Sequence, residues 1–485
     1  MVTLSSRAAE IVCKASIYRP ATTRLVAAEP IKLERGPHLF IDDFLIAESK
    51  NVRRVVNRPQ RDEHVNNPII SGKEDGCFQP YMTVLRDSAN GKFRIWYGAR
   101  TPDFSPSRSR LAHMESDDGV RWRGMRVLDT PTIQFGASVL DEGPAFADPQ
   151  RRFKFAWWAP PEPARAGGLP GLKLASSPDG FLWQQMKRPG AADDVIVPHN
   201  HDINSLFRDP IRNRYVAIMS THVTDPAWNG ERRVTTQGVS DDLFNWRTPW
   251  RVLVTDPRVE HDHTQFYAMD GFIARGPLLI GMVKVLRDDL NADAPPVAPD
   301  PPDAYGVGYT ALAWSRDGEL WTRDREIFFD RDPRRGTWDH AHAWIDEQVP
   351  VGDNVFLYYG GYARGHKVNR FEERQIGLVR MKRDRYVARE AGVEGGTIVT
   401  PTVVIDGRDM TMNADAAGGG IRVQLLNAST RKPIDGFTFA DARPIADDAL
   451  DAPLKWKGEL AHLAGRSVRI EFRMTSARLF GIDVR

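Results

Sequence analysis

Short runs of alternating apolar and polar residues dominate the chain. No stretch of three or more helical turns keeps its apolar residues at the period of an amphipathic helix. One pattern recurs instead, in which a strand end and a polar or Gly-containing turn lead into an apolar, often aromatic-rich strand. The five hairpins that it predicts span residues 85–97, 146–158, 207–219, 272–285 and 349–359.

A second repeat lies downstream of the hairpins and has the template Ser-x-Asp-Gly-x-x-Trp. Its copies read SDDGVRW (116–122), SPDGFLW (177–183), SDDLFNW (240–246) and SRDGELW (315–321). Ser and Asp can cap a tight turn through backbone N–H groups, Gly supplies a positive φ, and Trp packs between neighbouring sheets. We therefore expect a structural role for this repeat.

The spacing of the hairpins, roughly 60 to 80 residues, suits a blade of four strands with elaborated loops. Five copies predict an all-β, five-bladed β-propeller, with four or six blades as alternatives. After Tyr386 the pattern changes, and a Gly-rich stretch introduces short strands that predict a β-sandwich of about 95 residues. We expect a leader or surface arm at 1–35, the propeller at 36–390 and the sandwich at 391–485.

The composition excludes several classes of function. Lys and Arg number 66 against 64 Asp and Glu, so no basic excess is present to bind nucleic acid. Cys13 and Cys77 are too few for a disulfide scaffold and are expected to be free thiols. No apolar run approaches the ~20 residues of a membrane span, and the leader lacks the apolar core of a secretory signal. The sequence predicts a soluble, cytoplasmic protein without a membrane partner and leaves its oligomeric state open.

Polar segments precede the first strands of the predicted hairpins. They read DGCFQPY (75–81), DEGP (141–144), HDINS (201–205), EHDHTQFY (260–267) and WDHAHAW (338–344). The innermost strands of a propeller begin at one mouth of its axial channel, so these segments are expected to converge there. A shared functional site explains their charges better than core filling, because a buried charge needs a partner or a shifted pKa.

Glycoside cleavage gives these carboxyl groups a role. It needs one protonated carboxyl group to assist the leaving oxygen and one ionised group to act as base or nucleophile, about 5 to 10 Å apart. Asp43 is a weaker candidate. Alternation along a strand sends it and its neighbour Asp42 to opposite faces, so only one of them can face the axial channel. The candidate catalytic residues are Asp141 or Glu142, Asp202, Glu260 or Asp262, Asp339 and Asp43.

Histidines and amides in the same segments suit the binding of sugar hydroxyl groups. The pairs His261 with His263 and His340 with His342 could also ligate a metal, since this spacing puts both rings on one face of a strand. We favour sugar binding over a zinc site and expect no required cofactor, while a structural Ca²⁺ or a water in the axial channel stays open. The expected substrate-binding residues are Gln79, Tyr81, His201, Asn204, His263, Gln265, Tyr267, Trp338, His340 and His342.

Several motifs resemble the superfamily of five-bladed propeller glycoside hydrolases and transferases, which includes families 32, 43, 68 and 130. They are LFIDDFLIAE (39–48), the hairpins, the Ser-x-Asp-Gly turns, YYGG (358–361) and AGVEGGT (391–397). Family-32-like proteins with a terminal sandwich are the nearest in pattern, and the resemblance covers residues 36–485. It implies an enzyme that processes furanosides or pyranosides with three acidic residues on successive inner strands.

The chain departs from that superfamily at two points. It has no Asn-Asp-Pro-Asn-Gly-like string, and Gln79-Pro80 stands where related families place an acidic residue or Asn before Pro. FRDP (207–210) is similar to the tetrapeptide that carries the stabilising Asp of family 32. The internal repeat nevertheless assigns Asp209 to the same hairpin turn as Asp87 and Asp148.

Three functions compete on this evidence. The leading one is a glycoside hydrolase acting on an oligosaccharide, or a transglycosylase that uses a second sugar in place of water. A carbohydrate-binding propeller without the acid–base pair is the alternative, supported by Gln79 and Gln265 at positions where carboxylates would be needed. A sialidase is less favoured, because its turns carry an extra residue between Asp and Gly.

Overall fold

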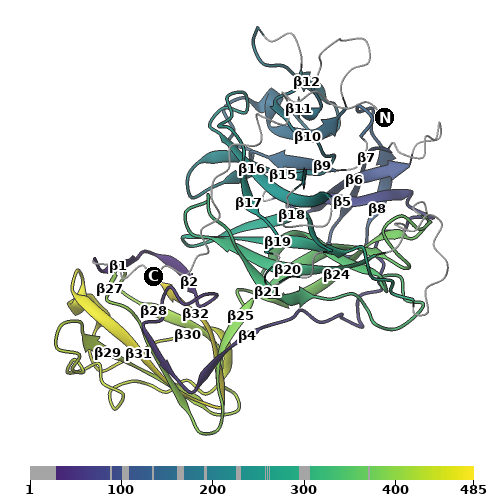
Figure 1. The fold of residues 1–485 in the computed structure, drawn as a ribbon. Helices are drawn as coiled ribbons and strands as arrows, with labels where there is room; N and C mark the ends of the chain where they lie inside the picture. Colours follow the sequence, from purple (N-terminus) through teal and green to yellow (C-terminus); the bar gives the residue numbers. More distant parts are fainter. Residues whose placement is uncertain are drawn as a thin grey trace.

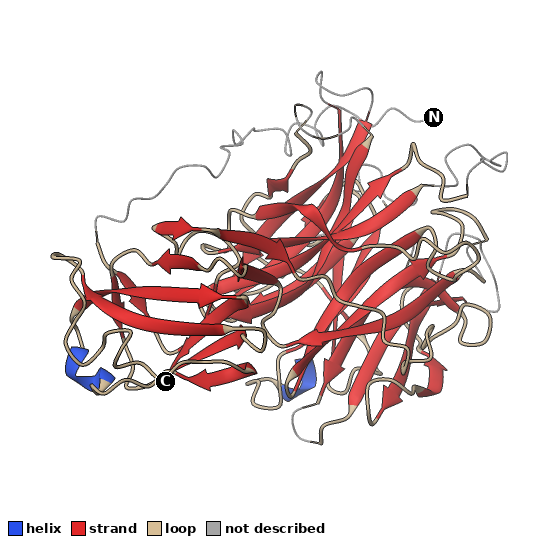
Figure 2. Cartoon of the chain, turned by 90° about the horizontal axis from the view of Figure 1, so that it is seen from below, coloured by secondary structure: helices blue, strands red, loops and turns tan. Residues whose placement is uncertain are grey.

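The computed structural model of the chain is almost entirely β-structure (Figure 2). Its described residues form strands and two short 3-10 helices, Pro149–Arg151 and Leu460–Leu463, and no α-helix occurs among them. This is the all-β class that the absence of helical periodicity predicts. The described residues are 29–87, 90–100, 109–133, 136–160, 169–190, 194–224, 231–256, 258, 260, 263–293, 306–369 and 372–485.

The middle of the chain folds into five consecutive antiparallel units, which we number 1 to 5. Units 4 and 5 share one sheet through a single parallel bridge between Gly308 and His342. The strands are as follows: unit 1, β5 (Cys77–Arg86), β6 (Phe93–Arg100), β7 (Ser109–Ser116) and β8 (Arg123–Val127); unit 2, β9 (Ala137–Asp141), β10 (Phe153–Ala159), β11 (Gly171–Ser177), β12 (Gln184–Met186) and β13 (Val197–Pro198); unit 3, β14 (Asn204–Asp209), β15 (Arg214–Thr224), β16 (Glu231–Ser240) and β17 (Trp250–Leu253); unit 4, β18 (Thr264–Arg275), β19 (Leu278–Arg287), β20 (Val307–Ser315) and β21 (Thr322–Phe329); unit 5, β22 (His342–Val351), β23 (Asn354–Tyr362) and β24 (Arg374–Lys382).

The first strands of these units contact one another in a closed cycle. Strand β5 contacts β9, β9 contacts β14, β14 contacts β18, β18 contacts β22, and β22 contacts β5 again. Unit 5 is extended at its outer edge by the segment that precedes unit 1, through bridges from Gln60 to Arg380 and from Ile70 to Ile376. An early part of the chain thus completes the last unit. Figure 1 shows this ring part, β5 to β24, beside a second part that contains the C-terminus.

The predicted hairpins occur, with one difference. Leu85 pairs with Arg94 and Phe207 with Val216, as their alternating patterns require. The second hairpin is wider than predicted, because β9 already ends at Asp141 and a loop with the first 3-10 helix follows. Asp209 Oδ1 accepts backbone N–H bonds from the residues two and three positions later, at 3.0 and 3.2 Å. It therefore has the local turn role that the internal repeat predicts.

The Ser-x-Asp-Gly turns are built as predicted. Ser116 Oγ accepts the N–H of Gly119 at 2.9 Å, and Asp118 Oδ1 accepts two further N–H groups at 2.8 Å. Gly119 has a φ of 74°, and Leu243 takes the corresponding conformation, at 71°, in the copy that lacks Gly. Trp122 packs edge-on against Tyr358 of unit 5, with ring centroids 6.1 Å apart. Side chains of the turn thus link one unit to another.

The carbonyl groups of the turn glycines make a second link between units. Tyr358 Oη donates to Gly119 O at 2.8 Å, and Trp96 Nε1 donates to Gly180 O at 3.0 Å. A Cβ at Gly180 would lie 2.8 Å from the Trp96 ring, so this approach requires glycine as well as its positive φ of 82°. Each of these turns anchors its unit to the preceding unit of the cycle.

The second part consists of two six-stranded sheets, which we call the two-sheet unit. One sheet has the order β1-β27-β31-β26-β3 with β29 beside β31, and the other has the order β30-β28-β32-β25-β4 with β2 beside β32. The strands are β1 (Ile31–Leu33), β2 (Gly36–Leu39), β3 (Glu48–Lys50), β4 (Val52–Val56), β25 (Val387–Ala391), β26 (Gly396–Val399), β27 (Val403–Ile405), β28 (Met410–Asp415), β29 (Gly420–Asn427), β30 (Asp448–Pro453), β31 (Ser467–Thr475) and β32 (Ala477–Val484).

Both ends of the described chain build this unit, which corrects the expected boundaries. Strands β2 to β4 were expected in the propeller, but they pair with β32, β26 and β25. Phe40 belongs to the same buried core as Ile398, Met412, Phe472 and Leu479, which come from both sheets. Asp42 and Asp43 were expected in a strand, but they lie in a bend between β2 and β3. No local pattern shows which sheet a strand will join.

Candidate functional site

Ten side chains from units 1, 3, 4 and 5 meet at one edge of the ring, which we call the axial mouth. This edge holds the starts of the first and third strands and the ends of the second strands, because neighbouring strands within a unit are antiparallel. The axial mouth consists of Tyr81, His201, Asp202, Arg233, Gln265, Tyr267, Trp344, Tyr362, His366 and Arg374.

Tyr267 is the hub of the axial mouth. Its buried ring stacks on Trp344 at a centroid distance of 5.1 Å and meets the edge of His201 at 6.0 Å. The Arg233 guanidinium lies over the same ring, 4.7 Å from its centroid. Tyr267 Oη lies 2.9 Å from His366 Nε2. The Tyr267 ring is therefore enclosed by its neighbours, and it is the polar groups around it that could bind the hydroxyl groups of a sugar.

A chain of polar contacts runs from Asp202 to the rim. His201 Nε2 lies 3.3 Å from Asp202 Oδ1 and accepts a hydrogen bond from Arg233 Nε at 3.2 Å. Arg233 Nη1 donates to Gln265 Oε1 at 2.7 Å, and Gln265 Nε2 donates to Asp288. Gln265 is therefore oriented at both ends, and the Asp202 side chain, 13% exposed, lies at the inner end of the chain.

The histidines around the axial mouth are held neutral. Burial lowers the pKa of His199 and of His342 to about 3. Burial, then the nearby Arg233 charge, also lowers the pKa of His201 well below its ordinary value. At neutral pH these imidazoles act as hydrogen-bonding groups rather than cations.

The structure brings together five of the residues predicted from strand starts: Tyr81, His201, Asp202, Gln265 and Tyr267. They were found because they lie within three residues of a strand start or on the axial face of β5. Two more predicted residues lie beside them. His342 packs against Trp344 and Tyr362 while its Nε2 bonds to Gly306 O, and Asn204 is buried against unit 2 through Gly136 O at 3.4 Å.

Asp141 and Glu142 do not reach the axial mouth. They were expected to precede a first strand, but β9 runs from Ala137 to Asp141, so they follow it. Five strand residues span about 16 Å, which separates the two edges of the sheet. Asp141 accepts two hydrogen bonds from Arg152, at 2.7 and 2.6 Å, and Glu142 accepts one from the Tyr215 hydroxyl group. Both carboxylates stabilise the hairpin edge instead.

Three further candidate acids are engaged in ion pairs away from this cluster. Asp339 is buried, accepts hydrogen bonds from Arg61 at 2.9 and 2.6 Å, and receives another from the Tyr359 hydroxyl group at 3.0 Å. Glu260 pairs with Arg323 of β21. The exposed Asp43 lies 2.8 Å from Arg389 in the two-sheet unit.

The aromatic and imidazole groups near Asp339 are likewise structural. Trp338 packs on Tyr359 at a centroid distance of 5.2 Å and fills the space above Gly361 and Gly377. His340 Nδ1 and Nε2 lie 2.9 and 3.2 Å from the carbonyl oxygens of Asp332 and Ala292. The expected convergence therefore fails for residues 338–340, which pack between units, whereas Trp344 of the same segment reaches the axial mouth.

Some expectations concern side chains outside the described residues. These are Asp262, His261 and Cys13, together with the side chain of Gln79, whose backbone pairs with Gly98 in β5. Cys77 is buried and free, as predicted.

Reasoning from first strands missed half of the axial mouth. Arg233 and Arg374 lie at the starts of the third strands β16 and β24, Tyr362 ends a second strand, and His366 follows it. Trp344 had a detectable signal, because it lies two residues after His342 and thus on the same face of β22. The other four residues gave no such signal in the sequence, since only the folded ring brings the ends of second strands and the starts of third strands to this edge.

His263 marks the rim of the axial mouth together with two carboxylates. One ligand atom from each of His263, Asp288 and Asp289 lies within 4.8 Å of the others. Both carboxylates already have partners, since Arg287 donates to Asp289 at 2.8 and 2.7 Å and Gln265 donates to Asp288. Arg287 thus balances the charge of Asp289, whereas the Gln265 amide that donates to Asp288 is neutral.

A buried ionic cluster lies below the axial mouth, between units 4, 5 and 1. Lys284 Nζ lies 2.7 Å from Asp270 Oδ2 and also pairs with Asp346, which in turn accepts the N–H of Met82. The Lys284 side chain is 2% exposed, and burial lowers its pKa. Burial and then the Asp270 charge raise the pKa of Glu347 well above its ordinary value. The cluster therefore holds one cation among three carboxyl groups.

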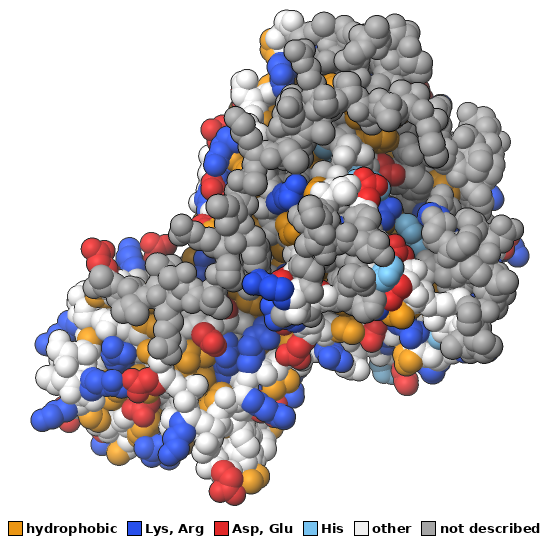
Figure 3. All heavy atoms as spheres, in the orientation of Figure 1, with side chains coloured by type: hydrophobic (Ala, Val, Ile, Leu, Met, Phe, Trp, Pro, Cys, Tyr) orange, Lys and Arg blue, Asp and Glu red, His pale blue; other side chains and the backbone are white. Residues whose placement is uncertain are grey.

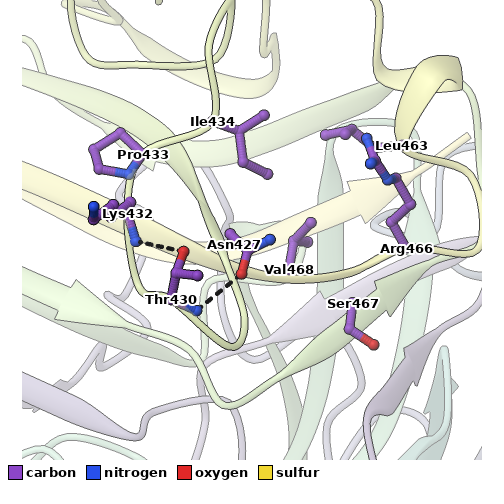
Figure 4. A pocket seen from close by; sticks show the side chains of 9 residues that line it. All are labelled: Asn427, Thr430, Lys432, Pro433, Ile434, Leu463, Arg466, Ser467 and Val468. Atoms are coloured by element: carbon purple, nitrogen blue, oxygen red, sulfur yellow. Dashed lines mark hydrogen bonds between the residues drawn. The ribbon is translucent and has the colours of Figure 1, made fainter.

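A pocket also opens on the two-sheet unit (Figure 4). Asn427 Oδ1 accepts the Thr430 N–H at 2.9 Å and shapes the loop that forms one wall. The pocket is exposed and far in sequence from the ring units. Its lining residues are Asn427, Thr430, Lys432, Pro433, Ile434, Leu463, Arg466, Ser467 and Val468.

The surface differs between the two parts of the molecule. On the face drawn in Figure 3, histidine and acidic side chains gather on the ring part, whereas scattered Lys and Arg side chains mark the two-sheet unit. In the described part of the chain, no helix has the length and apolar character needed to cross a membrane.

Comparisons with known proteins give likenesses in structure only. No protein-family model matches the chain, and no curated protein matches it. A solved structure titled "Glycoside hydrolase" is 14% identical over 70% of this chain and 92% of its own, with a TM-score of 0.43. A glycosyl hydrolase from Bacteroides ovatus is 14% identical over 68% and 96%, with a TM-score of 0.44. A structure from work on GH130 mannoside phosphorylases and glycoside hydrolases has a TM-score of 0.41, at 14% identity over 68% and 95%.

Proposed function

We propose that the chain is a glycoside hydrolase that binds an oligosaccharide at the axial mouth. In this proposal the five units are the blades of a five-bladed propeller and the two-sheet unit is a β-sandwich, as in family-32-like proteins. The closed cycle of first strands supports the propeller, and the shared core of the two sheets supports the sandwich. The reaction requires no cofactor in this scheme.

The observation that carries the proposal is the position of Asp202. It is a partly buried carboxylate beside a neutral imidazole and within the same side-chain cluster as the stacked rings of Tyr267 and Trp344. A carboxyl group next to a bound sugar ring can donate a proton to the leaving oxygen, activate water or attack the anomeric carbon. The polar side chains of the axial mouth would hold the sugar in position for that step.

Asp262 is our proposed second carboxyl group. Asp202 lies two residues before β14, and Asp262 lies two residues before β18. These are first strands of neighbouring units whose contact is part of the closed cycle, and the shared spacing along the sequence supports giving Asp262 the second role. Asp262 itself is outside the described residues.

Replacement of Asp202 tests this function directly. Asp202→Asn should lower kcat on a cleaved oligosaccharide by about 10²- to 10⁴-fold, because the amide can neither give nor take the proton. The measurement is reducing-end release with a matched melting temperature. Asp129→Asn is the control, since Asp129 is a fully exposed carboxylate paired with Arg110 at 3.2 Å. Full turnover by Asp202→Asn would refute the assignment.

Non-catalytic carbohydrate binding is the second candidate. It is favoured by Gln265, an amide held at both ends in a position where a carboxylate was expected. Such a protein would bind members of an oligosaccharide panel without releasing reducing ends. A transglycosylase would instead release products only when a second sugar is supplied as acceptor.

A further inference from the structure

No carboxylate bonds directly to the Arg233 guanidinium group within the described part of the chain, and Asp202 is separated from it by the His201 Nε2 that both contact. Its three partners are the imidazole Nε2 of His201 at 3.2 Å, the amide oxygen of Gln265 at 2.7 Å and the ring face of Tyr267 at 4.7 Å. Each of them is electrically neutral. The side chain is half-buried, where an unpaired charge costs more than it would in water.

Other half-buried arginines of the ring part are paired differently. Arg152 bonds to both carboxylate oxygens of Asp141 at 2.7 and 2.6 Å, and Arg287 bonds to both oxygens of Asp289 at 2.8 and 2.7 Å. A planar guanidinium group fits a carboxylate in this two-point manner. Arg233 differs, because His201 occupies its Nε and no described carboxylate accepts from its terminal nitrogen atoms.

The hydrogen bonds of Arg233 leave one edge of its guanidinium group open. Nε and one N–H of Nη1 are used by His201 and Gln265, whereas Nη2 donates to no described residue. The three neutral partners fix the plane of the group, so its free edge is oriented before a ligand arrives. A second planar group with two oxygens could accept from Nη1 and Nη2 together.

We propose that Arg233 binds the carboxylate of an acidic sugar, so that the substrate is an oligosaccharide containing uronic acid. This inference rests on the proposed function, because it assigns a substrate class to the same axial mouth. Tyr267 ties the two together: its ring touches Arg233 on one side and Trp344 on the other. A sugar bound among the polar groups at the rim of the axial mouth would bring the carboxylate on its ring to the open guanidinium edge.

The local charge favours a carboxylate over a phosphate group. Arg233 offers a single fork, which matches the single charge and two oxygens of a carboxylate. The imidazoles of His201 and His222 beside it are kept uncharged, since burial lowers the pKa of both. A phosphate group has more oxygens and up to two charges, which would require further cationic donors.

Matched ligands test the proposal. Wild-type protein is titrated calorimetrically with tri-galacturonate and with the same trimer after its carboxyl groups have been reduced to alcohols. We expect the acidic trimer to bind at least about 10-fold more tightly, the value of one good charged hydrogen-bond pair. Equal affinity for the two trimers, or saturable binding of inorganic phosphate without binding of tri-galacturonate, would overturn the inference.

Variants assign the effect to Arg233. Arg233→Gln should lower the affinity for the acidic trimer about 10- to 100-fold and leave that for the reduced trimer unchanged. Arg233→Lys keeps the charge and most of the bulk, so its affinity for the acidic trimer should lie between those of the wild type and Arg233→Gln. This variant also controls for a loss of folding in Arg233→Gln. The control is Arg121→Gln, at a 92% exposed side chain outside the axial mouth. An equal loss for both trimers would also overturn the inference.

Reducing-end release separates this inference from the proposed function. If the acidic trimer binds selectively through Arg233 but is never cleaved, the hydrolase proposal fails while the substrate class stands. If neutral oligosaccharides are cleaved and acidic ones are not bound, the hydrolase proposal stands and the role of Arg233 fails.

Discussion

Two kinds of joint hold the first strands of the ring together. Between units 1 and 2, Thr83 Oγ1 accepts the N–H of Val139 at 2.9 Å, and between units 2 and 3, Ser138 Oγ accepts the N–H of Leu206 at 3.0 Å. Both acceptors are buried neutral hydroxyl groups. A hydroxyl group of this kind satisfies a backbone donor without bringing a charge into the core.

The joint that closes the ring has a carboxylate in the same position. Asp346 of unit 5 accepts the N–H of Met82 in unit 1 and pairs with Lys284 of unit 4, which also pairs with Asp270. Three units therefore depend on one ionic cluster. The closing joint is thus stabilised by a set of charges that must all be present, whereas the joints at Thr83 and Ser138 depend on hydrogen bonds of neutral hydroxyl groups.

Removal of the Lys284 charge should lower the free energy of unfolding more than any change to a neutral joint. Lys284→Met leaves Asp270 and Asp346 buried without their counter-charge, and we expect a loss of about 3–5 kcal/mol in the free energy of unfolding. Urea denaturation with matched m-values measures it. If Lys284→Met lowered the free energy of unfolding less than Ser138→Ala, the proposed difference between the closing joint and the neutral joints would be wrong.

The pH dependence of the Lys284→Met variant sharpens the same point. Without the cation, burial and mutual repulsion should raise the pKa of the carboxyl groups in the folded state above that in the unfolded state. Such groups favour the folded state at low pH, and that advantage is lost as the pH rises through the raised pKa. The deficit relative to wild type should therefore be smaller at about pH 5 than at about pH 8.

A neutral joint should give a middle-sized effect. Ser138→Ala removes the acceptor of the Leu206 N–H and leaves that group buried and unpaired, at a cost of about 1–3 kcal/mol. The measurement is the same urea midpoint. Ser138→Thr, which restores the hydroxyl group, serves as the matched control and should recover part of the loss.

An exposed ion pair should give the smallest effect. Arg121 lies 3.5 Å from Asp118 across a turn where both side chains contact solvent. Arg121→Gln should change the unfolding free energy by less than about 0.5 kcal/mol, because water screens the pair. A loss as large as that of Lys284→Met would show that burial is not what distinguishes the closing joint.

Local patterns were sufficient to predict the strands, the hairpins and the turns. The Ser116 and Asp118 caps follow from residue types alone, because the hydrogen bonds involved span three residues or fewer. Asp202 and Tyr267 followed from the rule that first strands converge. Asp141 did not, since its strand begins four residues before it, at Ala137, and carries it to the opposite edge.

The residues of the axial mouth that the sequence did not predict are brought there by contacts between residues far apart in sequence. Arg233 is linked to Gln265, and His366 to Tyr267, only after third strands are placed beside first strands of other units. The placement of β2 to β4 shows the same limit. An alternating pattern specifies a strand and its faces, but pairing with a distant strand requires the whole chain.

That pairing constrains how the protein can be made. Strand β2 hydrogen-bonds with β32, so the backbone groups of residues 36–39 have no partner until residues 481–484 have been synthesised. During synthesis the earliest described strands would emerge from the ribosome several hundred residues ahead of their partners. Production of the C-terminal residues as a separate fragment would leave two sheets with unpaired edges, and such a fragment should aggregate unless residues 29–56 are supplied with it.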